Sequence, residues 1–146
     1  MPRIGPGRAY WAQLSAPTAF TYYYGGFPYT LPQHDPVSHL LAPATPGASW
    51  NLIGPPTAGS VQWNLNTFRV RYPDPNNGQP LTISLLEATT PGAVPGFPAS
   101  SYPNGLVDNH VFDENSQVIS SGGYLSSGAG YWIEAYTECE LLWPSS

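Results

Sequence analysis

Apolar and polar residues alternate most clearly near the end of the chain, over residues 131–143. One set of alternate positions is apolar apart from a threonine: Tyr131, Ile133, Ala135, Thr137, Cys139, Leu141 and Trp143. The intervening positions hold all the acids of this stretch: Glu134, Glu138 and Glu140. Successive side chains of a strand point to opposite faces, so the pattern predicts one strand with a buried face, an exposed acidic face and a buried, unreactive thiol at Cys139.

The apolar set changes phase within residues 61–72. Val61, Trp63 and Leu65 stand at odd positions, whereas Phe68, Val70 and Tyr72 stand at even positions. A β-bulge shifts the phase of a strand by one residue and keeps both sets on one face. The pattern therefore predicts a single bulged strand, with the bulge near residues 66–67.

Helices are hard to place, because the stretches between prolines and glycines are short and rich in Thr, Tyr, Trp and Val, which favour strands. Eight strands are predicted, at 8–14, 18–24, 49–53, 61–72, 81–88, 106–112, 117–120 and 131–143. This number of strands with long connections indicates an all-β, antiparallel β-sandwich of the jelly-roll kind. We expect it to span 9–146 as one domain, after an extended N-terminal arm at 1–8.

The 18 prolines and 15 glycines among 146 residues raise the possibility of disorder. Two features oppose it, since only 9% of the residues are charged and 14% are aromatic, whereas disordered segments are rich in charge and poor in rings. The prolines also have a pattern, because none falls within 104–143. We therefore expect a folded β core with long Pro/Gly-rich loops at 25–48 and 89–105.

The charges exclude several functions. The chain has no lysine, its four basic residues are arginines, and its formal net charge is −5. Schiff-base catalysis and a phosphate-binding P-loop both need a lysine, and nucleic acids or anionic membranes need a basic surface. We expect no nucleic-acid or membrane partner. The first residues lack the apolar region of a signal peptide, which indicates synthesis and retention in a cytosol.

Candidate catalytic and metal-binding groups are sparse. His34, Asp35 and His39 match no metal-ligand spacing, and a single cysteine, Cys139, forms neither an intrachain disulfide nor a thiolate zinc site. Asp108 and His110 lie two residues apart and would share a strand face, which could hold a divalent cation, but a solvated turn with a surface histidine explains them without an ion. We predict no enzyme, cofactor or metal, and an enzyme using this Asp/His pair is the least favoured alternative.

The aromatic residues suggest a binding surface. Some lie in a Tyr-rich strand and others in the two long loops, and the candidates for partner contacts are Tyr23, Phe27, Tyr29, Phe97 and Tyr102. Exposed aromatic patches mark binding sites for sugars or proteins. The competing interpretation is that these rings fill a core that is poor in Leu and Ile.

This combination of a small, lysine-free, Pro/Gly-rich β domain with an arm carrying Arg3 and Arg8 resembles the capsid decoration (cement) proteins of tailed bacteriophages. The resemblance implies a non-enzymatic virion protein, made in the host cytoplasm, that forms a homo-oligomer, often a homotrimer. It would bind across subunits of the major capsid protein and stabilise the head. Arg3 and Arg8 would then pair with acids such as the Glu134, Glu138 and Glu140 face of a neighbour.

The alternative function is carbohydrate recognition, either as a free module or as a receptor-binding domain of a phage tail fibre. A platform of Tyr and Trp rings suits sugar rings. Tyr23, Tyr29 and Trp132 are the predicted glycan contacts.

Overall fold

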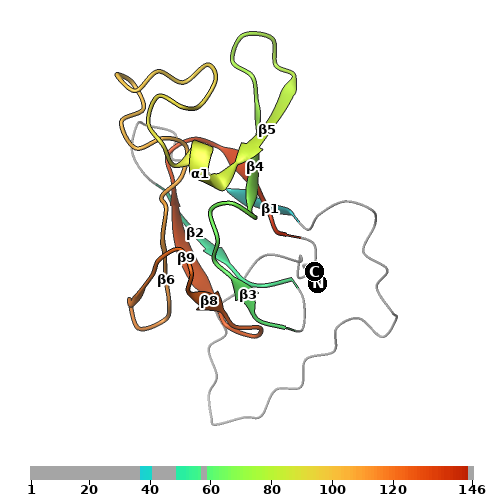
Figure 1. Ribbon diagram of the computed structural model, residues 1–146, viewed down its shortest axis with the longest axis vertical. Helices are drawn as coiled ribbons and strands as arrows, with labels where there is room; N and C mark the ends of the chain where they lie inside the picture. The colour runs from blue at the N-terminus through green and yellow to red at the C-terminus, as the bar shows by residue number, and fades with distance from the viewer. Residues whose placement is uncertain (1–36, 41–48, 57–58, 145–146) are drawn as a thin grey trace, which may run out of the picture.

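The computed structural model describes residues 37–40, 49–56 and 59–144 (Figure 1). The predicted arm at 1–8, the predicted strands at 8–14 and 18–24, and the contacts proposed for Arg3, Arg8, Tyr23, Phe27 and Tyr29 lie outside these residues. Within them no helix is long and apolar enough to span a membrane.

The described part of the chain is almost entirely β-sheet. Its strands are β1 (Val37–Leu40), β2 (Ser49–Ile53), β3 (Val61–Gln62), β4 (Arg69–Pro73), β5 (Pro80–Ser84), β6 (Val111–Phe112), β7 (Val118–Ile119), β8 (Tyr124–Leu125), β9 (Tyr131–Ala135) and β10 (Cys139–Leu142), and one helical turn, α1 (Leu85–Ala88), follows β5.

These strands form two four-stranded sheets, β1-β10-β4-β5 and β2-β9-β6-β7, and a two-stranded sheet, β3-β8, in which all neighbours are antiparallel. Buried side chains from both four-stranded sheets belong to one core. The predicted all-β, antiparallel class is confirmed, and the finer jelly-roll topology stays a prediction.

The stretch 131–143 forms two strands, so the prediction of one long strand is wrong. β9 lies second in one four-stranded sheet and β10 lies second in the other. Between them the chain turns, and the amides of Tyr136 and Thr137 donate to the carbonyl of Leu106 at 2.8 and 3.4 Å. The predicted burial pattern survives the break, since Ala135 and Cys139 are both buried. The single acidic face does not survive, because Glu134 and Glu140 belong to different sheets.

The stretch 61–72 also forms two strands, so the predicted bulge is wrong. β3 pairs with β8, whereas β4 pairs with β10 and β5. The amides of Thr67 and Phe68 donate to the carbonyl of Asn64 at 3.1 and 3.2 Å, which closes a turn between the strands. Trp63 and Phe68 are nevertheless both buried, because a turn shifts the apolar phase as effectively as a bulge does.

The other strand predictions are confirmed in part. The predicted strand at 49–53 is β2, while 81–88 divides into β5 and α1. The helical turn begins at Ser84, whose hydroxyl oxygen accepts a hydrogen bond from the amide of Glu87 at 3.1 Å, as a helix N-cap does. Of 106–112 only β6 is a strand, with one isolated bridge from Val107 to Ala135. β1 lies in a predicted loop, and β8 was not predicted.

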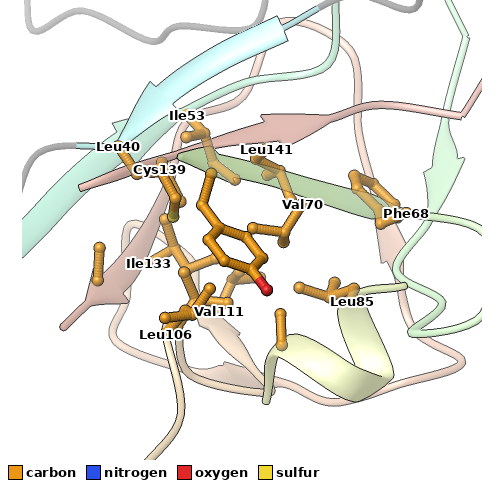
Figure 2. Close-up of a cluster of buried hydrophobic side chains, with 14 of the residues drawn as sticks. Leu40, Ile53, Phe68, Val70, Leu85, Leu106, Val111, Ile133, Cys139 and Leu141 are labelled. Atoms are coloured by element: carbon orange, nitrogen blue, oxygen red, sulfur yellow. The ribbon is translucent and has the colours of Figure 1, made fainter. Parts of the chain in front are cut away.

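The core lies between the two four-stranded sheets (Figure 2). Aliphatic residues from both sheets meet there, among them Leu40, Val70, Ile133 and Leu141. Toward one end of the core the rings of Trp63, Phe68 and Trp143 follow one another, with centroids 4.8 and 5.1 Å apart. Rings therefore supply much of the interior volume, as expected for a chain with few Leu and Ile residues.

The indole of Trp143 is fixed by a buried hydrogen bond. Its Nε1–H donates to Oγ of Ser38, on the edge strand β1, at 2.7 Å. Both side chains are almost fully buried. This bond fixes the ring that ends the aromatic row and ties β1 to the core.

We expect Ser38→Ala to lower the free energy of unfolding by about 1–3 kcal/mol, because the buried indole N–H loses its acceptor. Urea unfolding followed by tryptophan fluorescence measures this. Ser100→Ala, at an exposed loop position, is the control and should stay within about 0.5 kcal/mol of the wild type. Equal values for the two variants would contradict a structural role for the bond.

Candidate functional site: an aromatic hollow

The outer face of the sheet β2-β9-β6-β7 carries aromatic side chains from three adjacent strands. In β2, β9 and β6 the residues Ile53, Ile133 and Val111 are buried in the core. The alternate residues, Trp50, Trp132 and Phe112, therefore point away from the core. The register places Trp132 between Leu52 on one side and Phe112 on the other.

These rings surround an open hollow of about 450 Å³. It is lined by Trp50, Phe112, Ser116 and Trp132, and the lining is predominantly apolar. Trp50 and Phe112 stand edge to face, with centroids 5.6 Å apart and an interplanar angle of 68°. Trp50 is 49% exposed, and Val118, paired with Phe112 across β6 and β7, is also exposed. The hollow thus presents ring surface to solvent.

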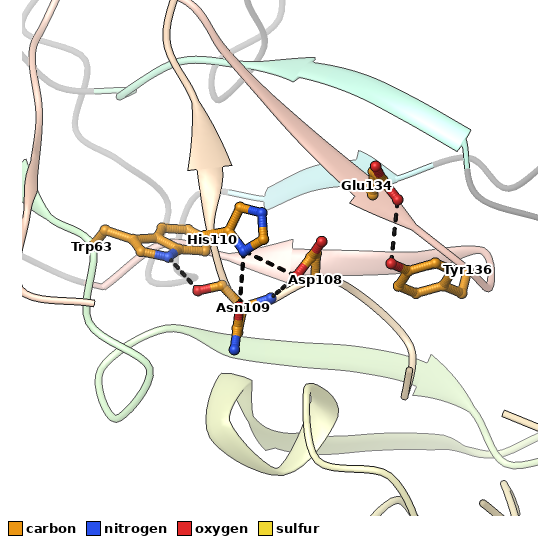
Figure 3. A network of polar contacts seen from close by, with 6 residues as sticks. All are labelled: Trp63, Asp108, Asn109, His110, Glu134 and Tyr136. Carbon is orange, nitrogen blue, oxygen red and sulfur yellow. Dashed lines mark hydrogen bonds and ion pairs between the residues drawn. The ribbon is translucent and has the colours of Figure 1, made fainter. Parts of the chain in front are cut away.

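A polar network supports the hollow from the start of β6 (Figure 3). The Nε1–H of the buried Trp63 donates to the carbonyl of Asn109 at 3.0 Å, which fixes this segment to the core. Nδ1 of His110 lies 2.9 Å from Oδ1 of Asn109 and 3.2 Å from Oδ1 of Asp108. The imidazole stands edge to face with Phe112, at 5.0 Å and 80°. Asp108 and His110, which the sequence offered as a candidate cation-binding or enzymatic pair, therefore position a ring of the hollow.

A metal ion at this network has too few ligands nearby. Nowhere in the described ranges do three His, Cys, Asp or Glu side chains gather closely enough to hold an ion. The candidates His34 and Asp35 lie outside those ranges, as does the side chain of His39.

The surroundings of the hollow are acidic. Glu134 faces Trp50 across the β2–β9 pair, and its carboxylate accepts a hydrogen bond from the Tyr136 hydroxyl at 3.2 Å. Burial, together with the charges of Asp108 and Glu134, raises the pKa of Tyr136 to about 12, so this phenol stays a donor at neutral pH. Residues 106–138 contain five acids and neither Lys nor Arg. An anionic ligand would therefore meet no compensating cation on these segments.

The predicted contact residues Phe97 and Tyr102 pack within the domain. Phe97 is buried, with its ring centroid 5.4 Å from that of Tyr72 and 4.6 Å from that of Tyr102. The hydroxyl of Tyr72 donates to the carbonyl of Pro95 at 3.0 Å. Phe97 packs on Tyr72 of β4 and Tyr102 packs on Phe97, so these two rings hold the loop 89–105 against the sheet and do not form an exposed patch.

The acids expected to receive Arg3 and Arg8 of a neighbour are mostly engaged within the chain. Arg71 and Glu140 face each other on β4 and β10 and form a bidentate pair at 2.7 and 3.3 Å. This hydrogen-bonded pairing raises the pKa of Arg71. Glu134 accepts the Tyr136 hydroxyl, and Glu138 is exposed.

Sequence reasoning placed only one residue of the hollow in a binding surface, Trp132. Trp50, Phe112 and Ser116 were missed. In β2, apolar residues occupy both phases, so alternation does not show which face is buried. The two-residue strand β6 is too short for any periodicity.

No protein-family model, curated protein or solved structure matches this chain. The function must therefore be inferred from the arrangement of the side chains.

Cys139 lies on the core side of β10 and is buried, as predicted. Burial, with smaller contributions from Glu140 and Glu138, raises the pKa of its thiol from 9.0 to about 12. The unfolded chain ionises this thiol at lower pH than the folded chain does. The contribution of the protonated thiol to the free energy of unfolding is therefore fully present below pH 9 and is lost as the pH rises toward 12.

We expect the free energy of unfolding to fall between pH 8 and pH 10, and to fall less steeply in Cys139→Ala. Urea unfolding at pH 8, 9 and 10 measures both slopes. The comparison ends at pH 10, because the raised pKa of Tyr136 contributes in the same direction above that value. Parallel slopes for the two proteins would show that the thiol is not the titrating group.

Proposed function

We propose that this chain is a non-enzymatic recognition protein that binds a neutral carbohydrate in the aromatic hollow. The observation that carries this proposal is the group of three outward-facing rings, Trp50, Phe112 and Trp132, on adjacent strands of one sheet. A pyranose ring has a flat face of C–H groups, which packs against the negative face of an aromatic ring. The described residues of the lining supply three aromatic rings and one hydroxyl, the groups that suit the binding of a sugar.

The size of the hollow favours a sugar over a protein surface. A stable protein interface buries about 800 Å² on each partner, through some 20–30 residues. In the part of the chain that the structure describes, four residues line this hollow of about 450 Å³, a scale that matches one or two sugar rings.

The charge around the hollow selects among sugars. The acids of residues 106–138 lie on the segments that form and flank it, and these segments contain neither Lys nor Arg. Uronic and sialic acids would be repelled. Neutral hexoses are the expected ligands.

A glycan array followed by calorimetry tests the proposal. We expect neutral glycans to bind to the wild type, and Trp50→Ala or Trp132→Ala to weaken binding at least about 10-fold, the equivalent of about 1.4 kcal/mol for a lost ring contact. Tyr124→Ala is the matched control, because this ring is 62% exposed and lies outside the hollow. Urea unfolding confirms that the variants are folded. Equal affinities for all four proteins would contradict the site.

A structural role in a virion is the second candidate. As a capsid decoration protein, the chain would form a homotrimer and bind the major capsid protein on the capsid surface. The observation that favours it is that Leu86 and Tyr124, 46% and 62% exposed, give apolar contact points away from the hollow. A subunit that touches several neighbours needs more than one such point, and many weak contacts add up in a shell.

Deletion of residues 1–8 tests this role. If the arm docks on the shell, the truncated protein should show reduced occupancy on purified particles, and the particles should disrupt at lower temperature, since a ligand of the assembled state stabilises it. Quantitative mass spectrometry of particles and a thermal disruption assay measure these effects. Unchanged values in both assays would remove the arm from the proposal.

A further inference from the structure

Ser116 has a backbone conformation that normally belongs to glycine. Its φ is +60°, and it is the one non-glycine residue with positive φ in the part of the chain that the structure describes. Six glycines there have positive φ. A side chain with a Cβ is sterically disfavoured in this region, and such residues cluster at functional sites.

The turn that contains Ser116 does not depend on its side chain. The turn joins β6 to β7, and Oδ1 of Asp113 accepts hydrogen bonds from the amides of Asn115 and Gln117, both at 2.9 Å. The Asp113 amide donates to the Gln117 carbonyl at 3.0 Å. Ser116 contributes its own amide, which donates to the Asp113 carbonyl at 3.0 Å, and glycine has the same amide.

Ser116 is also one of the residues that line the hollow, together with three aromatic residues. Among the described lining residues, it is the one that carries a side-chain hydroxyl. A sugar that stacks its C–H face on a ring carries its hydroxyls around the rim of that face. A serine beside the rings can exchange a hydrogen bond with one of them.

We propose that Ser116 is a specificity-determining residue, whose hydroxyl hydrogen-bonds one hydroxyl of a neutral hexopyranose held by the rings. This inference rests on the proposed carbohydrate-binding function. The rings supply affinity for any sugar with a flat apolar face, and Ser116 distinguishes sugars by the position of the hydroxyl at one edge. The unfavourable conformation is explained if the hydroxyl is needed there, because glycine would form the same turn with less strain.

Two substitutions remove the hydroxyl and differ in their effect on the turn. Ser116→Gly relieves the backbone, so its midpoint of urea unfolding should equal or exceed that of the wild type. Ser116→Ala keeps the Cβ in the same conformation, so its midpoint should not exceed that of the wild type. Both should bind the neutral glycan identified with the wild type about 2- to 10-fold more weakly, the loss expected for one net hydrogen bond.

Monodeoxy derivatives of that glycan identify the partner hydroxyl. For the wild type, the derivative that lacks the partner hydroxyl should bind more weakly than the parent sugar. For Ser116→Gly, this derivative and the parent sugar should bind with equal affinity. A purely structural effect would lower the affinity for every derivative by the same factor.

The possible failures can be distinguished. If the wild type binds no neutral glycan, the proposed function itself is wrong. If the wild type binds, Trp132→Ala loses binding, and both Ser116 variants bind like the wild type, the function stands and the role of Ser116 is overturned. Uniform weakening across all deoxy derivatives also overturns it.

Discussion

The fold depends on one segment that supplies an interior strand to each of two sheets. Residues 131–135 form β9 and residues 139–142 form β10, and the carbonyl of Leu106 holds the turn between them. Ala135 and Cys139 are four residues apart, an even number, so odd-numbered residues face the core both before and after the turn. Both strands therefore bury their odd positions in one core. In β9 the same constraint sets the even positions outward, Trp132 among them, so the geometry of the core also determines where ring surface meets solvent.

The alternation over 131–143 predicted most of the buried side chains, although Leu142 of the other phase is buried too, and it could not show that the strand is broken. A turn of this length leaves the alternation intact, and the hydrogen bonds that make it come from Leu106, a residue far away in sequence. In 61–72 the pattern did record a break, but a bulge and a turn leave the same signature. The distinction depends on the partners: β3 pairs with β8, whereas β4 pairs with β10 and β5. Local periodicity gives no information about which distant segments pair as strands.

The candidate site was predictable to a smaller degree. Trp132 could be recognised because it is a large apolar residue among the alternate positions of 131–143 that also hold the glutamates. Trp50 gave no such signal, since β2 has apolar residues in both phases, and Phe112 belongs to a strand of two residues. Loop position was a poor guide to exposure, because Phe97 lies in a Pro/Gly-rich loop and is buried against Tyr72. In a chain with few Leu and Ile residues, rings from loops are drawn into the core.

Tryptophan occurs in two settings in this domain, in the core and on the outer face of a sheet, and the core tryptophans depend on a hydrogen bond. A tryptophan can be buried at little cost only if its indole N–H finds an acceptor. Trp63 and Trp143 meet this condition through the Asn109 carbonyl and the Ser38 hydroxyl, and both are fully buried. Trp50 lies on the opposite face of its sheet and keeps half of its surface in water. The first of these acceptors belongs to the segment that leads through His110 to Phe112, so a buried tryptophan also steadies the exposed rings. The hollow is thus attached to the core at the start of β6, where the Trp63–Asn109 hydrogen bond and the His110–Phe112 ring contact fix one of its rings relative to the buried aromatic row.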